Sequence, residues 1–169
     1  MIKVLIFGCG GSMGRVLADL VGGTDDIEVA AGVDAFVEGQ EFTFPVFASL
    51  ADCDVAVDVI VDFSSPKALR DLLDGARQIN VPLVIATTGH SDEDRKYMIQ
   101  VAESIPVFQA ANMSIGINLL TDLLRKTAAV LGNQFDIEIV EKHHNLKNES
   151  LPGMDRHDTK DIDSETAQD

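Results

Sequence analysis

The chain has 169 residues, enough for one domain with a sizeable core and part of a second. Its 46% hydrophobic and 24% charged residues exclude collagen-like and wholly disordered proteins. A formal net charge of -15 argues against nucleic acids and anionic membrane surfaces as partners, because clustered Lys and Arg bind both.

The apolar runs and the cysteines bear on cellular location. The longest apolar runs are far shorter than the roughly 20 residues of a membrane span, and residues after Met1 lack the apolar region of a signal peptide. The two cysteines, Cys9 and Cys53, match neither a disulfide framework nor a metal-site spacing. We therefore expect a cytoplasmic protein without a metal site.

Strand-like and helix-like segments alternate along most of the chain. Continuous apolar runs predict parallel strands that are covered on both faces, and apolar spacings of three and four residues predict amphipathic helices. The predicted order is a strand over 2–7, a helix over 12–21, a strand over 27–33, a loop over 35–47, a strand over 54–62, a helix over 66–78, a strand over 81–87, a helix over 92–104, a strand over 107–111, a helix over 115–131 and a strand over 135–141.

This alternation with short connections predicts an α/β fold with a doubly wound, right-handed parallel sheet. We expect residues 1–114 to form that domain and residues 115–147 to begin a second, α+β domain. Residues 148–169 have few apolar side chains and repeated acids, which predicts a disordered acidic tail.

A glycine-rich turn joins the first strand to the first helix. The segment Gly8-Cys9-Gly10-Gly11-Ser12-Met13-Gly14 departs from G-x-G-x-x-G and fits G-x-x-G-x-x-G. Its position is where backbone amides and a helix N-terminus meet the pyrophosphate of a dinucleotide. The alternative is a turn that needs glycine only for positive φ and tight packing.

Asp34 ends the second strand, about 20 residues after the last glycine of the turn. An acid at this place can accept hydrogen bonds from the adenosine ribose hydroxyls of a Rossmann-bound cofactor. Because no Arg or Lys follows closely to pair with a 2′-phosphate, we expect NADH to be preferred, with NADPH possible. The alternative is an ordinary turn aspartate.

Small polar residues follow the fourth and fifth strands. Residues 87–89 and 111–113 lie where the carboxyl ends of parallel strands line a ligand crevice, and small side chains there let a nicotinamide ring approach. Alternatively, Asn112 or Ser114 simply caps the helix that follows.

Residues 141–147 combine one acid, two imidazoles and two ammonium groups. A histidine can transfer a proton near pH 7, and Lys147 could bind an anionic substrate or donate a proton. The alternative is a solvated polar loop. A zinc site lacks support, because no cysteine or third well-spaced ligand accompanies the histidines.

Together these segments resemble dihydrodipicolinate reductase of bacterial lysine and diaminopimelate synthesis. The resemblance rests on GCGGSMGR, VDFSSP, ATTGH, QAANMSIGIN and EIVEKHHNLK, which occur in the family's order over residues 1–147. Their combination is more specific than any one of them.

The resemblance implies a reductase that passes a hydride from nicotinamide C4 to an unsaturated, dianionic six-membered ring, giving tetrahydrodipicolinate. It implies the beginning of a substrate domain after residue 114, and the family is homo-oligomeric. By matching positions, it implies that the dinucleotide is held by Gly8, Cys9, Gly10, Gly11, Ser12, Met13 and Asp34, and that the nicotinamide is framed by Ala86, Thr87, Thr88, Ala110, Ala111, Asn112 and Met113. It assigns catalysis to His143 and Lys147, and substrate binding to His144.

The resemblance stops after residue 147. Where the family continues with Asp-Ala-Pro-Ser-Gly-Thr, which grips a substrate carboxylate, this chain has NESLPG at 148–153. We therefore expect a truncated or divergent member, and a second hypothesis is an NAD(H)-binding module or inactive fragment without catalysis. A semialdehyde dehydrogenase-like protein or another oxidoreductase has less support, since no cysteine occupies a plausible nucleophile position.

Overall fold

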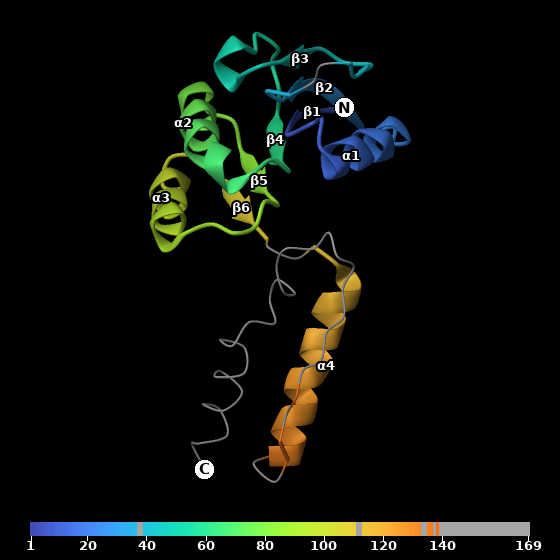
Figure 1. Ribbon diagram of the computed structural model, residues 1–169, viewed down its shortest axis with the longest axis vertical. Helices are drawn as coiled ribbons and strands as arrows, with labels where there is room; N and C mark the ends of the chain where they lie inside the picture. The colour runs from blue at the N-terminus through green and yellow to red at the C-terminus, as the bar shows by residue number, and fades with distance from the viewer. Residues whose placement is uncertain (37–38, 111–112, 133–134, 137, 139–169) are drawn as a thin grey trace. The chain divides into compact units, whose positions relative to one another are not determined.

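The computed structural model describes residues 1–36, 39–110, 113–132, 135, 136 and 138. They divide between a compact unit, Met1–Ala110, and a second unit that begins at Ala111. Figure 1 shows the elements of the first unit, which in chain order are β1 Ile2–Phe7, α1 Ser12–Gly22, β2 Ile27–Val33, β3 Val46–Phe47, the 3-10 turn η1 Leu50–Asp52, β4 Val59–Asp62, the 3-10 turn η2 Pro66–Ala68, α2 Leu69–Ile79, β5 Leu83–Ile85, α3 Asp92–Ala102 and β6 Val107–Gln109.

The six strands form one parallel sheet in the order β3-β2-β1-β4-β5-β6. This confirms the predicted doubly wound α/β fold. The strand order reverses at β1, the central strand, and Phe7 at its end is in register with both Val33 and Asp62. The carboxyl ends of β1, β2 and β4 are therefore level, which is where open α/β sheets bind ligands.

The sheet is covered on both faces, as the apolar first strand predicts. Leu5 and Phe7 belong to a core cluster that includes α2 and α3 residues, whereas Val4 and Ile6 belong to another cluster, against which Leu17 of α1 packs. Successive side chains of a strand point to opposite faces. A central strand with a helix layer on each side therefore needs apolar residues at consecutive positions.

The expectation of a loop over residues 35–47 is wrong at its end. Val46 and Phe47 form β3, the edge strand beside β2. The backbone N–H of Gly32 donates to the Pro45 carbonyl at 2.9 Å, and that of Asp34 donates to the Phe47 carbonyl at 3.0 Å. These two bonds come from a partner distant in the chain, so no local pattern indicates them.

The predicted strand over 54–62 is shorter in the structure, because β4 begins at Val59. Val59 pairs with Val4, and the backbone N–H of Asp58 donates to the Lys3 carbonyl at 2.8 Å. Since β1 begins at Ile2, the residues before Val57 have no partner on that strand. The 3-10 turn η1, which precedes this segment, was not predicted.

The helices agree more closely with prediction than the strands do. The predicted helix over 66–78 consists of the 3-10 turn η2 followed by α2, and α3 begins at the expected residue, Asp92, with Ser91 as its cap. The strands β5 and β6 are shorter than predicted. A strand was expected over 135–141. The structure describes three of these residues, Phe135, Asp136 and Glu138, and none of the three is in a strand. The rest of that strand and the tail over 148–169 lie outside the described residues.

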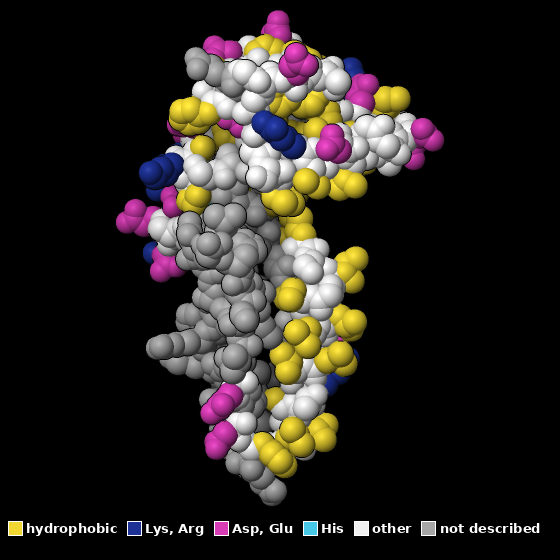
Figure 2. All heavy atoms as spheres, turned by 45° about the vertical axis from the view of Figure 1, so that its right-hand side comes forward, with side chains coloured by type: hydrophobic (Ala, Val, Ile, Leu, Met, Phe, Trp, Pro, Cys, Tyr) yellow, Lys and Arg dark blue, Asp and Glu magenta, His cyan; other side chains and the backbone are white. Residues whose placement is uncertain are grey.

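The second unit contains α4 (Ile115–Leu131). The Ser114 hydroxyl accepts a hydrogen bond from the Ile117 N–H at 3.4 Å, and the chain leaves the helix at Gly132 with φ 63°, as the sequence predicts. Large hydrophobic side chains are exposed along α4 in Figure 2; they are Ile115, Leu119, Leu120, Leu123, Leu124, Val130 and Leu131. Within the described part of the chain, no helix has the length and apolarity that crossing a bilayer requires.

Candidate functional site

The turn between β1 and α1 is built so closely that side chains do not fit. Gly8 has φ +86°, and a Cβ on it would lie 2.8 Å from the Cα of Ser64. A Cβ on Gly14 would lie 2.3 Å from the carbonyl oxygen of Gly8. Real Cβ atoms do not approach backbone this closely, so both positions require glycine. The bare backbone of the turn is thereby left open to a ligand.

The N-terminus of α1 is free to receive an anion. Gly11 is its N-cap, no side chain caps the helix, and its first turn contains no acid. The N-terminus of α3 differs, because Ser91 and Asp94 form a capping box and three acids occupy the first turn. The first N–H groups of a helix need partners, and the helix dipole favours negative charge there. The geometry at α1 therefore suits a phosphate.

Asp34 at the end of β2 reaches back to the glycine turn. Its Oδ2 accepts a hydrogen bond from the Gly10 N–H at 2.8 Å, and its Oδ1 accepts one from the Phe36 N–H at 2.9 Å. Each carboxylate oxygen has two lone pairs, so both oxygens keep the capacity to accept another hydrogen bond. Held in this way, the carboxylate can receive two neighbouring hydroxyls.

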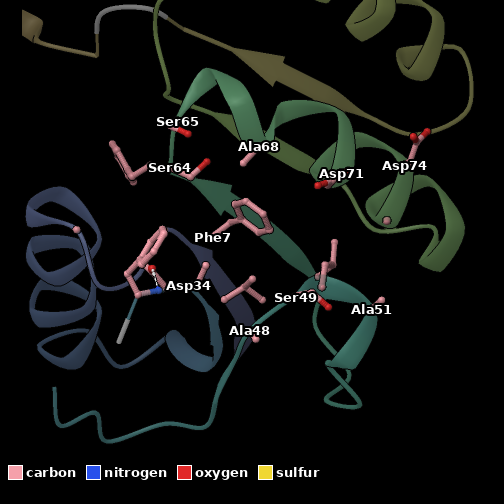
Figure 3. A pocket seen from close by; sticks show the side chains of 18 of the residues that line it. Phe7, Asp34, Ala48, Ser49, Ala51, Ser64, Ser65, Ala68, Asp71 and Asp74 are labelled. Carbon is pink, nitrogen blue, oxygen red and sulfur yellow. Dashed lines mark hydrogen bonds between the residues drawn. The ribbon is translucent and has the colours of Figure 1, made fainter. Parts of the chain in front are cut away.

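The glycine turn and Asp34 face one cavity of about 710 Å³, shown in Figure 3. Its volume lies within the ordinary range for small-molecule and cofactor sites. The cavity runs from the carboxyl ends of β1 and β2 to the side of α2. It is lined by Phe7, Gly8, Gly11, Val33, Asp34, Ala35, Phe36, Ala48, Ser49, Leu50, Ala51, Phe63, Ser64, Ser65, Ala68, Asp71, Asp74, Gly75 and Gln78.

The turn after β4 is also part of this site, although none of its residues was among the predicted site residues. Asp62 is buried, and its Oδ1 accepts hydrogen bonds from the Ser64 N–H at 3.0 Å and the Ser64 hydroxyl at 2.6 Å. These bonds fix the turn that packs against Gly8 and exposes Phe63 to the cavity. Its place after a parallel strand was the signal that could have identified it.

The end of β5 carries small and polar side chains. Ala86 and Thr88 are half-buried, and the Ala86 N–H donates to the Asp62 carbonyl at 3.0 Å. Thr87 and His90 are buried, and among the described residues neither the Thr87 hydroxyl nor either nitrogen of His90 has a hydrogen-bond partner. Buried polar atoms of this kind are normally paired. Because β5 pairs with β4, the segment Ala86, Thr87 and Thr88 follows β5 beside the end of β4.

Three expected cofactor residues of the turn have different surroundings. The Cys9 side chain is fully buried in the core beneath α1, so only its backbone faces the turn. Burial, followed by the nearby Asp34 charge, raises the pKa of the Cys9 thiol to about 11. Ser12 and Met13 are exposed at the start of α1.

Of the remaining expected site residues, the structure describes two. Ala110 is half-buried after β6, and Met113 is exposed in the second unit. The others lie outside the described residues; they are Ala111, Asn112, His143, His144 and Lys147. Among the residues that the structure describes, no cluster of His, Cys, Asp and Glu could hold a metal ion.

The chain matches one protein family over most of the first unit. The profile of that family, described as "Dihydrodipicolinate reductase, N-terminus", matches residues 2–113. Relatives named 4-hydroxy-tetrahydrodipicolinate reductase include one from Clostridium perfringens, 42% identical over 154 residues, and one from Caldanaerobacter subterraneus, 44% identical over 153 residues. Each alignment covers 90% of this chain and 60% of the relative, so the chain spans about 60% of the length of these relatives.

Solved structures give the same result for the fold. A dipicolinate-bound dihydrodipicolinate reductase from Paenisporosarcina sp. TG-14 has a TM-score of 0.72 and 28% identity, covering 98% of this chain and 66% of that one. An apo scyllo-inositol dehydrogenase from Lactobacillus casei has a TM-score of 0.57 and 16% identity, covering 75% of this chain and 41% of that one. The second likeness reflects the fold alone.

Proposed function

The chain belongs to the dihydrodipicolinate reductase family, and from that premise we propose that it binds a reduced nicotinamide dinucleotide for the reduction of 4-hydroxy-tetrahydrodipicolinate to tetrahydrodipicolinate. The observation that carries the proposal is the hydrogen bond between Gly10 and Asp34, whose carboxylate lines the cavity. It joins a turn suited to a pyrophosphate to a carboxylate suited to ribose hydroxyls. The site therefore fits the adenosine and pyrophosphate of the cofactor.

The charges around the cavity favour NADH over NADPH. Three lining residues, Asp34, Asp71 and Asp74, carry carboxylates, and none of the lining residues is Lys or Arg. A 2′-phosphate beside Asp34 would meet a like charge without a cation to pair with it. Arg15 lies outside this cavity, in a hollow of about 450 Å³.

The acids of that hollow limit what Arg15 offers. Asp19 and Glu41 line the same hollow, and both are carboxylates. A phosphate that approached Arg15 would therefore also approach two negative side chains, which reduces the attraction. We propose NADH as the better ligand, with NADPH as a weaker one.

The chemistry proposed for the whole protein needs a hydride and a proton. The bound cofactor supplies the hydride, and the residues of this chain bind, orient and protonate. By the resemblance, His143 and Lys147 would deliver the proton and His144 would bind the substrate. The two ammonium groups of residues 141–147 also suit a ring with two carboxylates, because they would pair with its negative charges, and a histidine can supply the proton. We place this reaction in the cytoplasm.

Two measurements on the same preparation test the proposal. NADH and NADPH dissociation constants are measured from cofactor fluorescence, and turnover from the loss of absorbance at the nicotinamide band with freshly made substrate. We expect tighter binding of NADH, and turnover that falls in His143→Ala and Lys147→Ala while NADH affinity stays near that of the wild type. NADH binding without turnover would leave a binding module only, and no NADH binding would contradict the proposal as a whole.

A further inference from the structure

We propose that Asp71 recognises the purine base of the dinucleotide, by accepting a hydrogen bond from the 6-amino group of adenine. This inference rests on the proposed cofactor binding and makes Asp71 a specificity-determining residue of that site. It predicts that the site binds a dinucleotide whose purine has a 6-oxo group more weakly than one that contains adenine.

The direction of the base follows from the two ends of the cavity. Asp34 and the glycine turn lie at one end, where the ribose and the pyrophosphate would be held. The base must therefore extend into the rest of the cavity, toward α2. Its lining includes apolar side chains that suit a flat ring, with Ala48 and Leu50 contributed by one segment and Phe63 and Ala68 by another.

Asp71 is available at the α2 end of this cavity. It lies in the first turn of α2, its carboxylate points into the cavity in Figure 3, and it makes no hydrogen bond or ion pair with any described residue. It can therefore accept a hydrogen bond without losing one.

Two neighbouring polar side chains of the cavity, those of Ser49 and Asp74, are already engaged. The Ser49 hydroxyl donates to Asp52 at 2.7 Å. Asp74 accepts a short hydrogen bond from the Tyr97 hydroxyl and pairs with Arg77 at 3.2 Å, and its carboxylate points away from the cavity in Figure 3. Asp71 is therefore the carboxylate near the base that is free to select it.

The selection follows from donor and acceptor chemistry. Adenine has a 6-amino group, which donates, whereas hypoxanthine and guanine have a 6-carbonyl oxygen, which only accepts. A carboxylate also only accepts, so at position 6 it pairs with the amino group of adenine and repels the carbonyl oxygen of the other two. The N1–H of a 6-oxopurine is a donor beside that oxygen, and the carboxylate gains it only if the ring shifts in the cavity. Losing a hydrogen bond to a charged group costs more binding free energy than losing one to a neutral group. Asp71 is exposed to water, however, which reduces this cost. We expect a preference of about tenfold.

Asp71 could instead serve only the dipole of α2, since acids near a helix N-terminus are stabilising. The two roles differ in what they change. A dipole role alters stability alone, whereas base recognition alters the ratio of two affinities within one folded protein.

The test compares NADH with reduced nicotinamide hypoxanthine dinucleotide, which differs from it at the 6-position of the purine. Both are titrated by fluorescence into the wild type, Asp71→Asn and Asp74→Asn, after circular dichroism shows that each variant is folded. Because an amide both donates and accepts, we expect the tenfold preference for NADH to fall to nearly one in Asp71→Asn. Asp74→Asn removes the same charge from the same helix and should retain the preference.

Two results would overturn base recognition. One is equal binding of both dinucleotides by the wild type, and the other is an unchanged ratio in Asp71→Asn. The absence of any NADH binding by the wild type is a different outcome, because it removes the proposed function and this inference with it. If Asp71→Asn does not fold, the comparison is repeated with Asp71→Ser, whose hydroxyl donates and accepts in the same way.

Discussion

The backbone N–H of Gly10 lies 2.8 Å from Oδ2 of Asp34 and donates a hydrogen bond to it, which joins the turn after β1 to the end of β2. A Cβ on Gly10 would lie 2.9 Å from that same oxygen. The contact therefore depends on the absence of a side chain at position 10 as well as on the carboxylate at position 34. The two segments proposed to bind different parts of a dinucleotide are thus held in one geometry.

Replacing Asp34 with alanine should weaken NADH more than NADPH. The change removes the ribose acceptor for both cofactors, and for NADPH it also removes the charge that repels the 2′-phosphate. We expect NADH affinity to fall about tenfold and the NADH-to-NADPH affinity ratio to fall with it. Fluorescence titration measures both constants. Asp25→Ala removes one charge before β2, at the opposite end of that strand, and an equal fall in that variant would contradict the assignment.

Gly14→Ala and Gly22→Ala should change stability in opposite directions, although both glycines belong to α1. At position 14 the new Cβ would lie 2.3 Å from a backbone oxygen, whereas at position 22 no atom lies within 4 Å. We expect Gly14→Ala to lower the free energy of unfolding by about 1–3 kcal/mol and to weaken NADH binding. Gly22→Ala should raise the free energy of unfolding by up to about 1 kcal/mol, because alanine favours helix. Urea denaturation of both variants checks these signs, and a stable, tightly binding Gly14→Ala would be evidence against the close packing.

The only tyrosine of the chain reports on the contact between α2 and α3. Its hydrogen bond to Asp74, followed by burial, raises the pKa of the Tyr97 phenol above its ordinary value of about 10. The bond needs the protonated phenol, so its contribution to stability is present below pH of about 10 and is lost as the pH rises through the folded-state pKa. Because the protein has no tryptophan, tyrosinate absorbance follows Tyr97 directly. We expect the pKa to fall in Asp74→Ala and to change little in Asp71→Ala; equal effects of the two would argue against the bond.

Cys9 and Cys53 should differ in reactivity toward alkylation. Cys9 is fully buried and its pKa is raised to about 11, so at pH 8 it is a protonated thiol without access to reagent. Cys53 is half-buried, and its Sγ contacts the Val55 carbonyl at 3.9 Å. Mass spectrometry after iodoacetamide treatment should find modification at Cys53 alone in the folded protein and at both residues in urea. Modification of Cys9 in the folded protein would mean that the region beneath the glycine turn opens readily.

Features with a local cause could be predicted from the sequence. The apolar run of β1 predicted a strand buried on both faces, and the apolar spacing of residues 92–104 predicted α3, whose start is fixed locally by the Ser91 and Asp94 capping box. The glycine turn was also predictable, because the strand and helix on either side define its place. In these cases the residues that determine the structure are neighbours in the chain.

Features that depend on distant partners could not be predicted in the same way. The edge strand β3 exists because β2 pairs with it, and the start of β4 is set by where β1 begins. Asp71 resembles any exposed acid on a helix, and only the packing of α2 places it at the cavity. Local periodicity contains no information on such placements.

The strand order described above also has a consequence for how the protein folds. Every strand pairing in the sheet is parallel, so no two neighbouring strands can be joined by a tight hairpin, and each pairing must close a long loop of chain. Proteins with such non-local contacts fold slowly. The residues that line the cavity run from Phe7 to Gln78, so the cavity is complete only when β1, its partners β2 and β4, and α2 have assembled. In a refolding experiment, recovery of cofactor binding would therefore mark the end of assembly rather than its beginning.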